Sequence, residues 1–188
     1  MNVLASIIVV TNLAYLAAFD TETRCPSWNY YVLDPCEIVV TNRAANSFRT
    51  DPRVPESDLT RDYAKSGYDR GHLAPAADFN FDREALKETY LFTNIAPQEP
   101  TMNRGEWAEV EREVRTLAAS GSVHVLTVPV FDGRPARYMG RVRVPDAFEK
   151  TAFGYFGIRR WRVENHDVTL QMGACPSAEN TKKKEGTK

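Results

Sequence analysis

Apolar residues come in short blocks near the N-terminus, a pattern that predicts a series of β-strands. A run rich in β-branched residues fills positions 3–19, polar residues follow at 20–23, and further apolar blocks occupy 28–33 and 37–41. Short blocks joined by turns favour an antiparallel meander. The stretch 43–65 is polar and contains two prolines, so a long surface loop is favoured there over a packed element.

The middle of the chain has helical spacing. Residues 82–88 predict a short helix, and residues 103–119 predict a longer one, because apolar side chains recur on one face from Trp107 to Ala118 before Gly121 ends the pattern. Between these two helices, residues 90–95 predict a strand that ends at Pro97.

Strand patterns return in the last third of the chain. They are predicted at residues 123–131, 141–144, 152–158 and 166–172. The segment 176–188 carries little apolar surface and is expected to be a flexible tail. No repeat or linker divides the chain, so residues 1–175 are predicted to form a single domain.

Composition narrows the choice of partners. The chain has 188 residues, 43% of them apolar, which is enough to bury one core. Its formal net charge of −1 excludes a global basic field that would draw it to nucleic acid or to anionic lipid. Any binding to phosphates must therefore depend on a local group of arginines.

The N-terminal run and the cysteines bear on location. The run lacks a positively charged start and reaches Asp20 too early to span a bilayer, so a buried strand is favoured over a cleaved signal peptide. Cys25, Cys36 and Cys175 lack metal-type spacing and are interpreted as ordinary thiols, with a bridge between the first two only in an exported protein. We expect no membrane association, and an intracellular location is favoured over secretion.

Candidate chemistry is concentrated in residues 69–72, "DRGH". On an extended strand, alternation would place Arg70 and His72 on one side, while Gly71 allows close approach of another group. A guanidinium can neutralise phosphate oxygens and an imidazole can accept a proton at neutral pH, so this pair suits phosphate chemistry. Asp69 would point the other way and is expected to brace the structure. A packed structural histidine is the alternative interpretation.

Two blocks carry a wider resemblance. "DRGH" is followed by "LAPAADF", and about twenty residues later comes "TNIAPQEPTMNRGEWAEVE". Together they closely resemble the DNA/RNA non-specific endonuclease family, which are ββα-metal nucleases, over about residues 15–150. The resemblance implies an α+β fold with a mixed, mostly antiparallel central sheet, flanking helices and a ββα-metal active-site motif.

The resemblance also implies roles for individual residues. The family's general base falls on His72 and its metal-binding asparagine on Asn103, while Arg70, Asn94 and Glu111 take further catalytic positions. A neutral amide with several waters suits Mg²⁺, with Mn²⁺ as a substitute. On a continuous helix Glu111 lies about 12 Å beyond Asn103 (at about 1.5 Å per residue), which favours a water-bridged role over direct coordination.

Alternatives stay open at several of these positions. Asn103 is also suited to cap the helix, Glu111 to pair with Arg115, and Asn94 to satisfy a backbone group at a strand end. The family's upstream arginine falls on Arg43, with Arg49 as the alternative.

The function implied is Mg²⁺-dependent hydrolysis of DNA and RNA that leaves 5′-phosphate ends. The resemblance also admits a homodimer. Two other functions remain: a nuclease that prefers particular structures or sequences, and an inactive protein that only binds nucleic acid.

Overall fold

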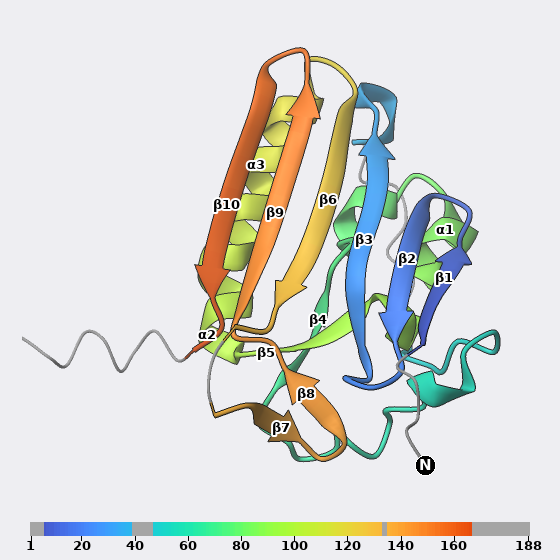
Figure 1. Ribbon diagram of the computed structural model, residues 1–188. Helices are drawn as coiled ribbons and strands as arrows, with labels where there is room; N and C mark the ends of the chain where they lie inside the picture. The colour runs from blue at the N-terminus through green and yellow to red at the C-terminus, as the bar shows by residue number, and fades with distance from the viewer. Residues whose placement is uncertain (1–5, 39–46, 133–134, 167–188) are drawn as a thin grey trace, which may run out of the picture.

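The protein is built on a six-stranded sheet with the strand order β1-β2-β3-β6-β9-β10 (Figure 1). The computed structural model describes residues 6–38, 47–132 and 135–166. All neighbours in this sheet pair antiparallel. The strands are β1 Ile7–Thr11, β2 Tyr15–Asp20, β3 Cys25–Leu33, β6 Val123–Val130, β9 Ala147–Gly154 and β10 Gly157–Glu164.

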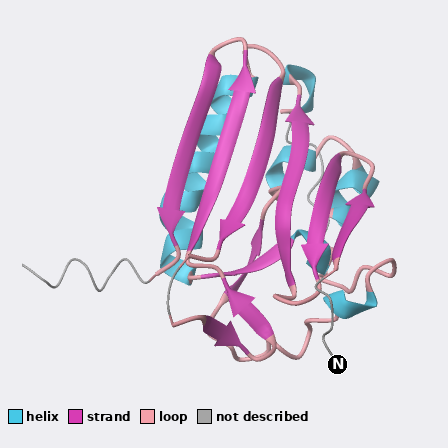
Figure 2. Ribbon diagram, viewed as in Figure 1, coloured by secondary structure: helices cyan, strands magenta, loops and turns pink. Residues whose placement is uncertain are grey.

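Two short ribbons and a set of helices complete the fold (Figure 2). The ribbons are β4 Asp69–His72 with β5 Ile95–Gln98, and β7 Arg137–Met139 with β8 Val142–Val144. The helices are α1 Arg83–Glu88, α2 Pro100–Met102 and α3 Ala108–Ala118, with η5 Asn103–Trp107 as a π-helical turn and η1 Pro35–Glu37, η2 Pro55–Ser57, η3 Ala76–Phe79 and η4 Phe92–Asn94 as 3-10 turns.

The core lies on the side of the sheet that faces the helices. Strand β6 alternates between buried and half-buried residues along its whole length, so Val123 and Val125 enter the core. Helix α3 buries Val110, Val114 and Ala118 behind β9 and β10 (Figure 1). The opposite side carries no helix among the described residues (Figure 1), and there Trp28, Tyr30, Leu126 and Val128 line a shallow apolar surface.

These elements confirm the predicted α+β architecture with its mostly antiparallel sheet. Helix α1 matches the prediction for 82–88, and the Asp82 side chain caps it by accepting hydrogen bonds from the backbone N–H groups of Glu84 and Ala85. The strand predicted at 123–131 is β6. The strand predicted at 37–41 and the one at 166–172 fall almost entirely outside the described residues, as does the tail at 176–188.

Several predicted boundaries were wrong, each because of a turn. The apolar run 3–19 folds back on itself, since the Asn12 N–H donates to the Tyr15 carbonyl and separates β1 from β2. Residues 90–95 do not form a strand: they pass through η4, and β5 begins only at Ile95. The strand predicted at 152–158 spans a turn: Gly157 adopts a φ of 88° and turns the chain from β9 into β10, which continues to Glu164 where no strand is predicted.

The polar stretch 47–65 is more than a surface loop. Val54, Leu59 and Tyr63 are buried, and the last two pack with Phe92 and Ile95 of the η4–β5 segment. Spaced apolar residues in a polar, proline-containing segment have no helical or strand period, so their burial was not predicted. This segment therefore supports one side of the β4–β5 ribbon.

The helix predicted from 103 to 119 is not continuous. Gly105 has φ −103° and ψ −105°, which are not helical angles, and the chain runs through α2 and the wide turn η5 before α3 begins. Wide turns of this kind are frequent at functional sites. The separation of about 12 Å expected between Asn103 and Glu111 assumed one straight helix at about 1.5 Å per residue. Because the helix is broken at Gly105, that estimate does not apply.

Candidate active site

The "DRGH" residues form β4, which pairs antiparallel with β5 from Asp69 opposite Gln98 to His72 opposite Ile95. Alternation along β4 places Arg70 and His72 on one face and Asp69 and Gly71 on the other. Gly71 is required here because a Cβ at this position would lie 2.1 Å from the Gln98 side chain. The close approach predicted for this glycine is therefore made by a side chain of the partner strand.

His72 lies against aromatic rings. Its ring centre is 5.4 Å from that of Phe48 and 5.0 Å from that of Tyr90. Burial lowers the pKa of His72 to about 4, so the imidazole is neutral at pH 7 and able to accept a proton. Its Nε2 atom is buried and has no hydrogen-bond partner within the described residues. Such an orphaned atom is accounted for when water or substrate completes the site.

Arg70 brings a positive charge to the same face of the ribbon. Its guanidinium lies 5.5 Å from the ring centres of both Phe48 and Tyr63. No ion pair within the described part of the chain involves Arg70, and its buried Nε lacks a partner. The aromatic rings hold the group in place while its charge is left for an anion.

Asp69 connects the ribbon to the start of the long helical segment. Its carboxylate accepts hydrogen bonds from Asn103 Nδ2 at 2.9 Å and from Arg104 Nη2 at 2.7 Å. Burial alone would raise the pKa of Asp69, but the hydrogen bonds from Arg104 and Asn103 outweigh it, so this pKa lies below its ordinary value. The bracing role predicted for Asp69 therefore extends to a second segment.

This contact orients the Asn103 amide. With Nδ2 held by Asp69, the carbonyl oxygen Oδ1 is used by no hydrogen bond within the described residues. An oxygen of this kind suits a hard cation such as Mg²⁺ that keeps most of its water. No group of three or more His, Cys, Asp or Glu side chains in the described ranges is arranged to hold a metal. The single amide oxygen of Asn103 suits an ion that keeps most of its water ligands.

Glu111 lies in α3, and the charges that act on it are those of Lys150, Asp78 and Arg115. Burial raises the pKa of Glu111 and the attraction of Lys150 lowers it in part. The alternative pairing with Arg115 is not formed: Arg115 Nη1 bonds to Asp78 at 2.8 Å instead. Glu111 therefore has Lys150 as its main opposite charge.

Asn94 occupies a scaffold position. Its side chain is fully buried, and Nδ2 donates to the carbonyls of Ala74 and Thr89 while Oδ1 accepts from the Ala74 N–H and from Asn29 Nδ2, all at 2.9 Å. No donor or acceptor of the amide is left for a substrate. The catalytic position implied for Asn94 stays a prediction, and these contacts agree with the alternative in which it satisfies backbone groups at a strand end.

The structure does not decide between the two candidates for the family's upstream arginine, Arg43 and Arg49. Arg43 lies outside the described residues. Arg49 is exposed, and its Nη1 donates to the Lys87 carbonyl at the end of α1 at 2.8 Å. The choice between them therefore stays a prediction.

Two polar residues at the site were not assigned from the sequence. Gln98 is fully buried, yet both polar atoms of its amide lack a partner among the described residues. Lys150 is buried on β9. A signal for Lys150 existed, because it shares the inward face of a strand with Phe148 and Ala152 at period two.

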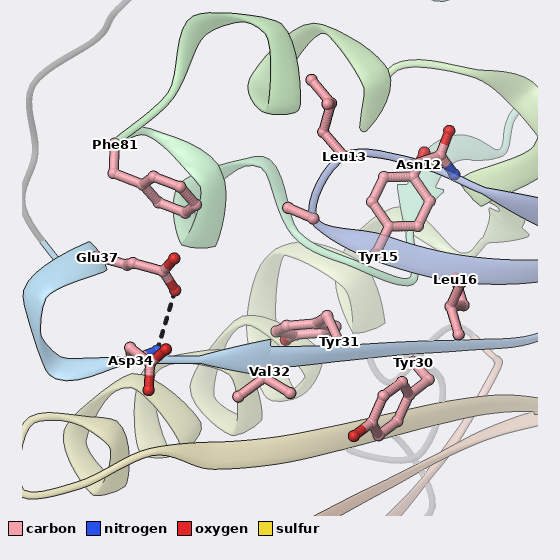
Figure 3. A pocket seen from close by; sticks show the side chains of 11 residues that line it. Asn12, Leu13, Tyr15, Leu16, Tyr30, Tyr31, Val32, Asp34, Glu37 and Phe81 are labelled. Carbon is pink, nitrogen blue, oxygen red and sulfur yellow. Dashed lines mark hydrogen bonds between the residues drawn. The ribbon is translucent and has the colours of Figure 1, made fainter.

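A separate cavity of about 380 Å³ opens between β2, β3 and η1 (Figure 3). Tyr30, Tyr31 and Phe81 contribute aromatic walls, and Asp34 and Glu37 lie at one end. Of the residues predicted for catalysis, none that the structure describes lines this cavity. Its carboxylates would repel a phosphate, so the cavity does not compete with the ribbon as a candidate site.

The ribbon β4–β5 followed by the α2–α3 segment is a ββα unit, with a histidine on the first strand and an asparagine at the turn before the helix. This arrangement defines a ββα-metal type of site. The sequence pattern of the DNA/RNA non-specific endonuclease family matches residues 5–183. The chain therefore belongs to that family. The resemblance inferred from the two sequence blocks is thereby confirmed.

Individual relatives agree with this assignment. The chain is 36% identical over 126 residues to "Nuclease 1, mitochondrial" of Schizosaccharomyces pombe, covering 64% of this chain and 39% of that protein. It is 34% identical over 122 residues to "Endonuclease G, mitochondrial" of Homo sapiens, covering 63% of this chain and 41% of that protein. The chain thus spans about two fifths of the length of these relatives.

A solved structure supports the fold. A crystal structure of the EndoG/EndoGI complex matches with a TM-score of 0.75 at 24% identity, over 84% of this chain and 74% of the other. At this level of identity the likeness establishes the architecture alone.

Replacing Asp69 by Asn should weaken the response to Mg²⁺. The amide introduced at position 69 is neutral, so it holds Asn103 Nδ2 less firmly than the Asp69 carboxylate does. Loss of such an orienting partner typically costs about 10–100-fold in metal affinity. We expect the dissociation constant for Mg²⁺, measured by titration calorimetry, to rise about tenfold. Asp62→Asn is the matched control, since Asp62 holds Arg141. An equal rise in both variants would contradict the role of Asp69.

The histidine ring should titrate at an unusually low pH. Monitoring the Cε1–H signal of His72 by NMR, assigned with His72→Ala, should give a midpoint near pH 4 rather than 6.5. Because the unfolded chain takes up this proton first, the contribution of His72 to the free energy of unfolding should decline as the pH falls from 6.5 to 4. A midpoint close to 6.5 would show that the ring is well solvated.

Proposed function

We propose that the protein hydrolyses phosphodiester bonds of DNA and RNA in the presence of Mg²⁺, leaving 5′-phosphate ends, with His72 as general base. The observation that carries the proposal is the pairing, on one face of the ribbon, of a neutral imidazole with an arginine that has no counter-ion among the described residues. The opposite side of the same strand orients Asn103. Family membership supports nucleic acid as the substrate class.

Each residue has a limited task. His72 accepts a proton from the attacking water, and its lowered pKa keeps it unprotonated at neutral pH. Arg70 offsets the charge that builds on the phosphate oxygens in the transition state. Asn103 would hold the cation through Oδ1, and Glu111 would accept hydrogen bonds from waters near it. When bound, Mg²⁺ supplies charge stabilisation for the scissile phosphate and the departing oxygen. Mn²⁺ is a candidate substitute.

The proposed contacts explain a broad substrate range. They all go to phosphate, cation or water, so they read neither a base edge nor a 2′-hydroxyl. The overall charge of −1 argues for modest affinity, because little long-range attraction supports binding. A homodimer and an intracellular location stay predictions. Among the described residues, no helix is both long and apolar enough to cross a bilayer.

Replacing His72 by Ala should nearly abolish cleavage. Loss of a general base typically costs about 10²–10⁴-fold in rate. We expect a kcat reduction in this range on plasmid DNA and on RNA with Mg²⁺, whereas Asn103→Ala should mainly raise the Mg²⁺ requirement. His124→Ala is the matched control, because His124 contacts Tyr30 and Phe153 on the other side of the sheet. Unchanged activity in His72→Ala would refute the assignment.

A substrate panel separates the proposal from its alternatives. Duplex DNA, single-stranded DNA, branched DNA and RNA should be cut at rates within about an order of magnitude, since phosphate contacts carry no sequence information. End-labelling of the products should show 5′-phosphates, and a chelator should stop all cleavage. Strong preference for one substrate would favour a selective nuclease. Binding without cleavage in Mg²⁺ or Mn²⁺ would favour an inactive binding protein.

A further inference from the structure

Lys150 is a buried cation beneath the ribbon that the proposed reaction does not use. Its side chain points from β9 into the core and is fully buried. Its Nζ atom donates to Thr127 Oγ1 at 2.7 Å and to the Leu73 carbonyl at 3.1 Å. It also lies 4.9 Å from the centre of the Trp107 ring. A buried ammonium is costly unless it is well paired, so this arrangement requires an explanation.

Lys150 helps to fix the backbone of Leu73, the residue that follows His72. The Leu73 carbonyl accepts from Lys150 and also from Thr127 Oγ1 at 3.2 Å. On its other side, the Leu73 N–H donates to the Asn94 carbonyl at 3.0 Å. Both polar groups of residue 73 are therefore held by buried partners. The end of β4 that carries His72 has little freedom to move.

The same cation reaches the helical segment. Trp107, whose ring it faces, ends the wide turn that begins at Asn103. One side chain thus contacts both segments of the ββα unit.

Lys150 also balances the charges around Glu111. The charged groups that face Lys150 are Glu111 and Arg115 from α3 and Asp78 from η3. Asp78 has its own partner in Arg115, at 2.8 Å. Of the charges around Glu111, Lys150 has the largest electrostatic effect on the pKa of Glu111, which it lowers. Loss of the ammonium would leave an excess of negative charge in a buried region, and Glu111 would then favour its protonated form.

We propose that Lys150 is a positioning residue for the hydrolysis: it fixes the carbonyl of Leu73, the residue after His72, and supplies the counter-charge of Glu111 without touching the substrate. The inference rests on the proposed function of the site. A lysine that only stabilised the fold would change the melting temperature and leave both the His72 ring and the turnover of the folded protein unchanged.

The test compares Lys150→Met with Lys87→Met, a matched change on the exposed surface of α1. For each folded protein, kcat and KM are measured on DNA with Mg²⁺, and the His72 ring signals are recorded by NMR in the metal-free state. We expect Lys150→Met to lower kcat about 10–100-fold with little change in KM, as loss of an orienting group does. The His72 signals should shift while those of His124 stay in place. Lys87→Met should match the parent protein.

A kcat equal to that of the parent, or His72 signals that do not move, would overturn the proposal. If Lys150→Met does not fold, Thr127→Val decides, because it keeps the ammonium but removes two hydrogen bonds of this network, from Thr127 Oγ1 to the Leu73 carbonyl and from Lys150 to Thr127 Oγ1. A smaller fall in kcat together with shifted His72 signals supports the proposal, and unchanged values overturn it. Should the parent itself fail to cleave nucleic acid, the proposed function fails, whereas the metal-free His72 signals still test the positioning.

Discussion

The buried amide of Asn94 is the constraint on which the rest of the site depends. It joins β3, the segment after β4 and the end of α1 through four hydrogen bonds of 2.9 Å. Loss of this side chain would leave buried backbone groups unpaired, at about 1–3 kcal/mol for each. Because Asn94 directly precedes β5, these bonds fix where the ribbon begins. Everything placed on the ribbon depends on that starting point.

Burial sets the chemistry of the ribbon in two opposite ways. Around His72, aromatic neighbours remove water without supplying a counter-charge, and the result is a neutral base. Around Glu111, water is removed as well, but Lys150, Arg115 and Asp78 provide charges of both signs. The ββα unit thus contains both an uncharged imidazole and a charge-balanced carboxylate. Both arise because the ββα unit packs directly on the central sheet.

Much of this could be predicted from the sequence, wherever the information was local. The alternation in β6, the Asp82 cap of α1 and the "DRGH" strand are short-range patterns, and the structure has each of them. The break at Gly105 and the burial of Tyr63 depend on tertiary packing, which no period in the sequence encodes. The same applies to the role of Asn94, because its partners lie up to 65 residues away in the chain. The two sequence blocks that resemble the family predicted the site because residues of both lie in the β4–β5 ribbon.

The last strand of the sheet has a consequence for how molecules of this protein behave in concentrated solution. Strand β10 is an edge strand within the described residues, and Arg159, Arg160 and Arg162 lie along it, with Arg162 bonded to Asp132, Glu149 and Glu164. Charged side chains on an outer strand make it unfavourable for a second sheet to continue the ladder. The arginines thus act as a barrier to fibre-like growth at the β10 edge of the sheet.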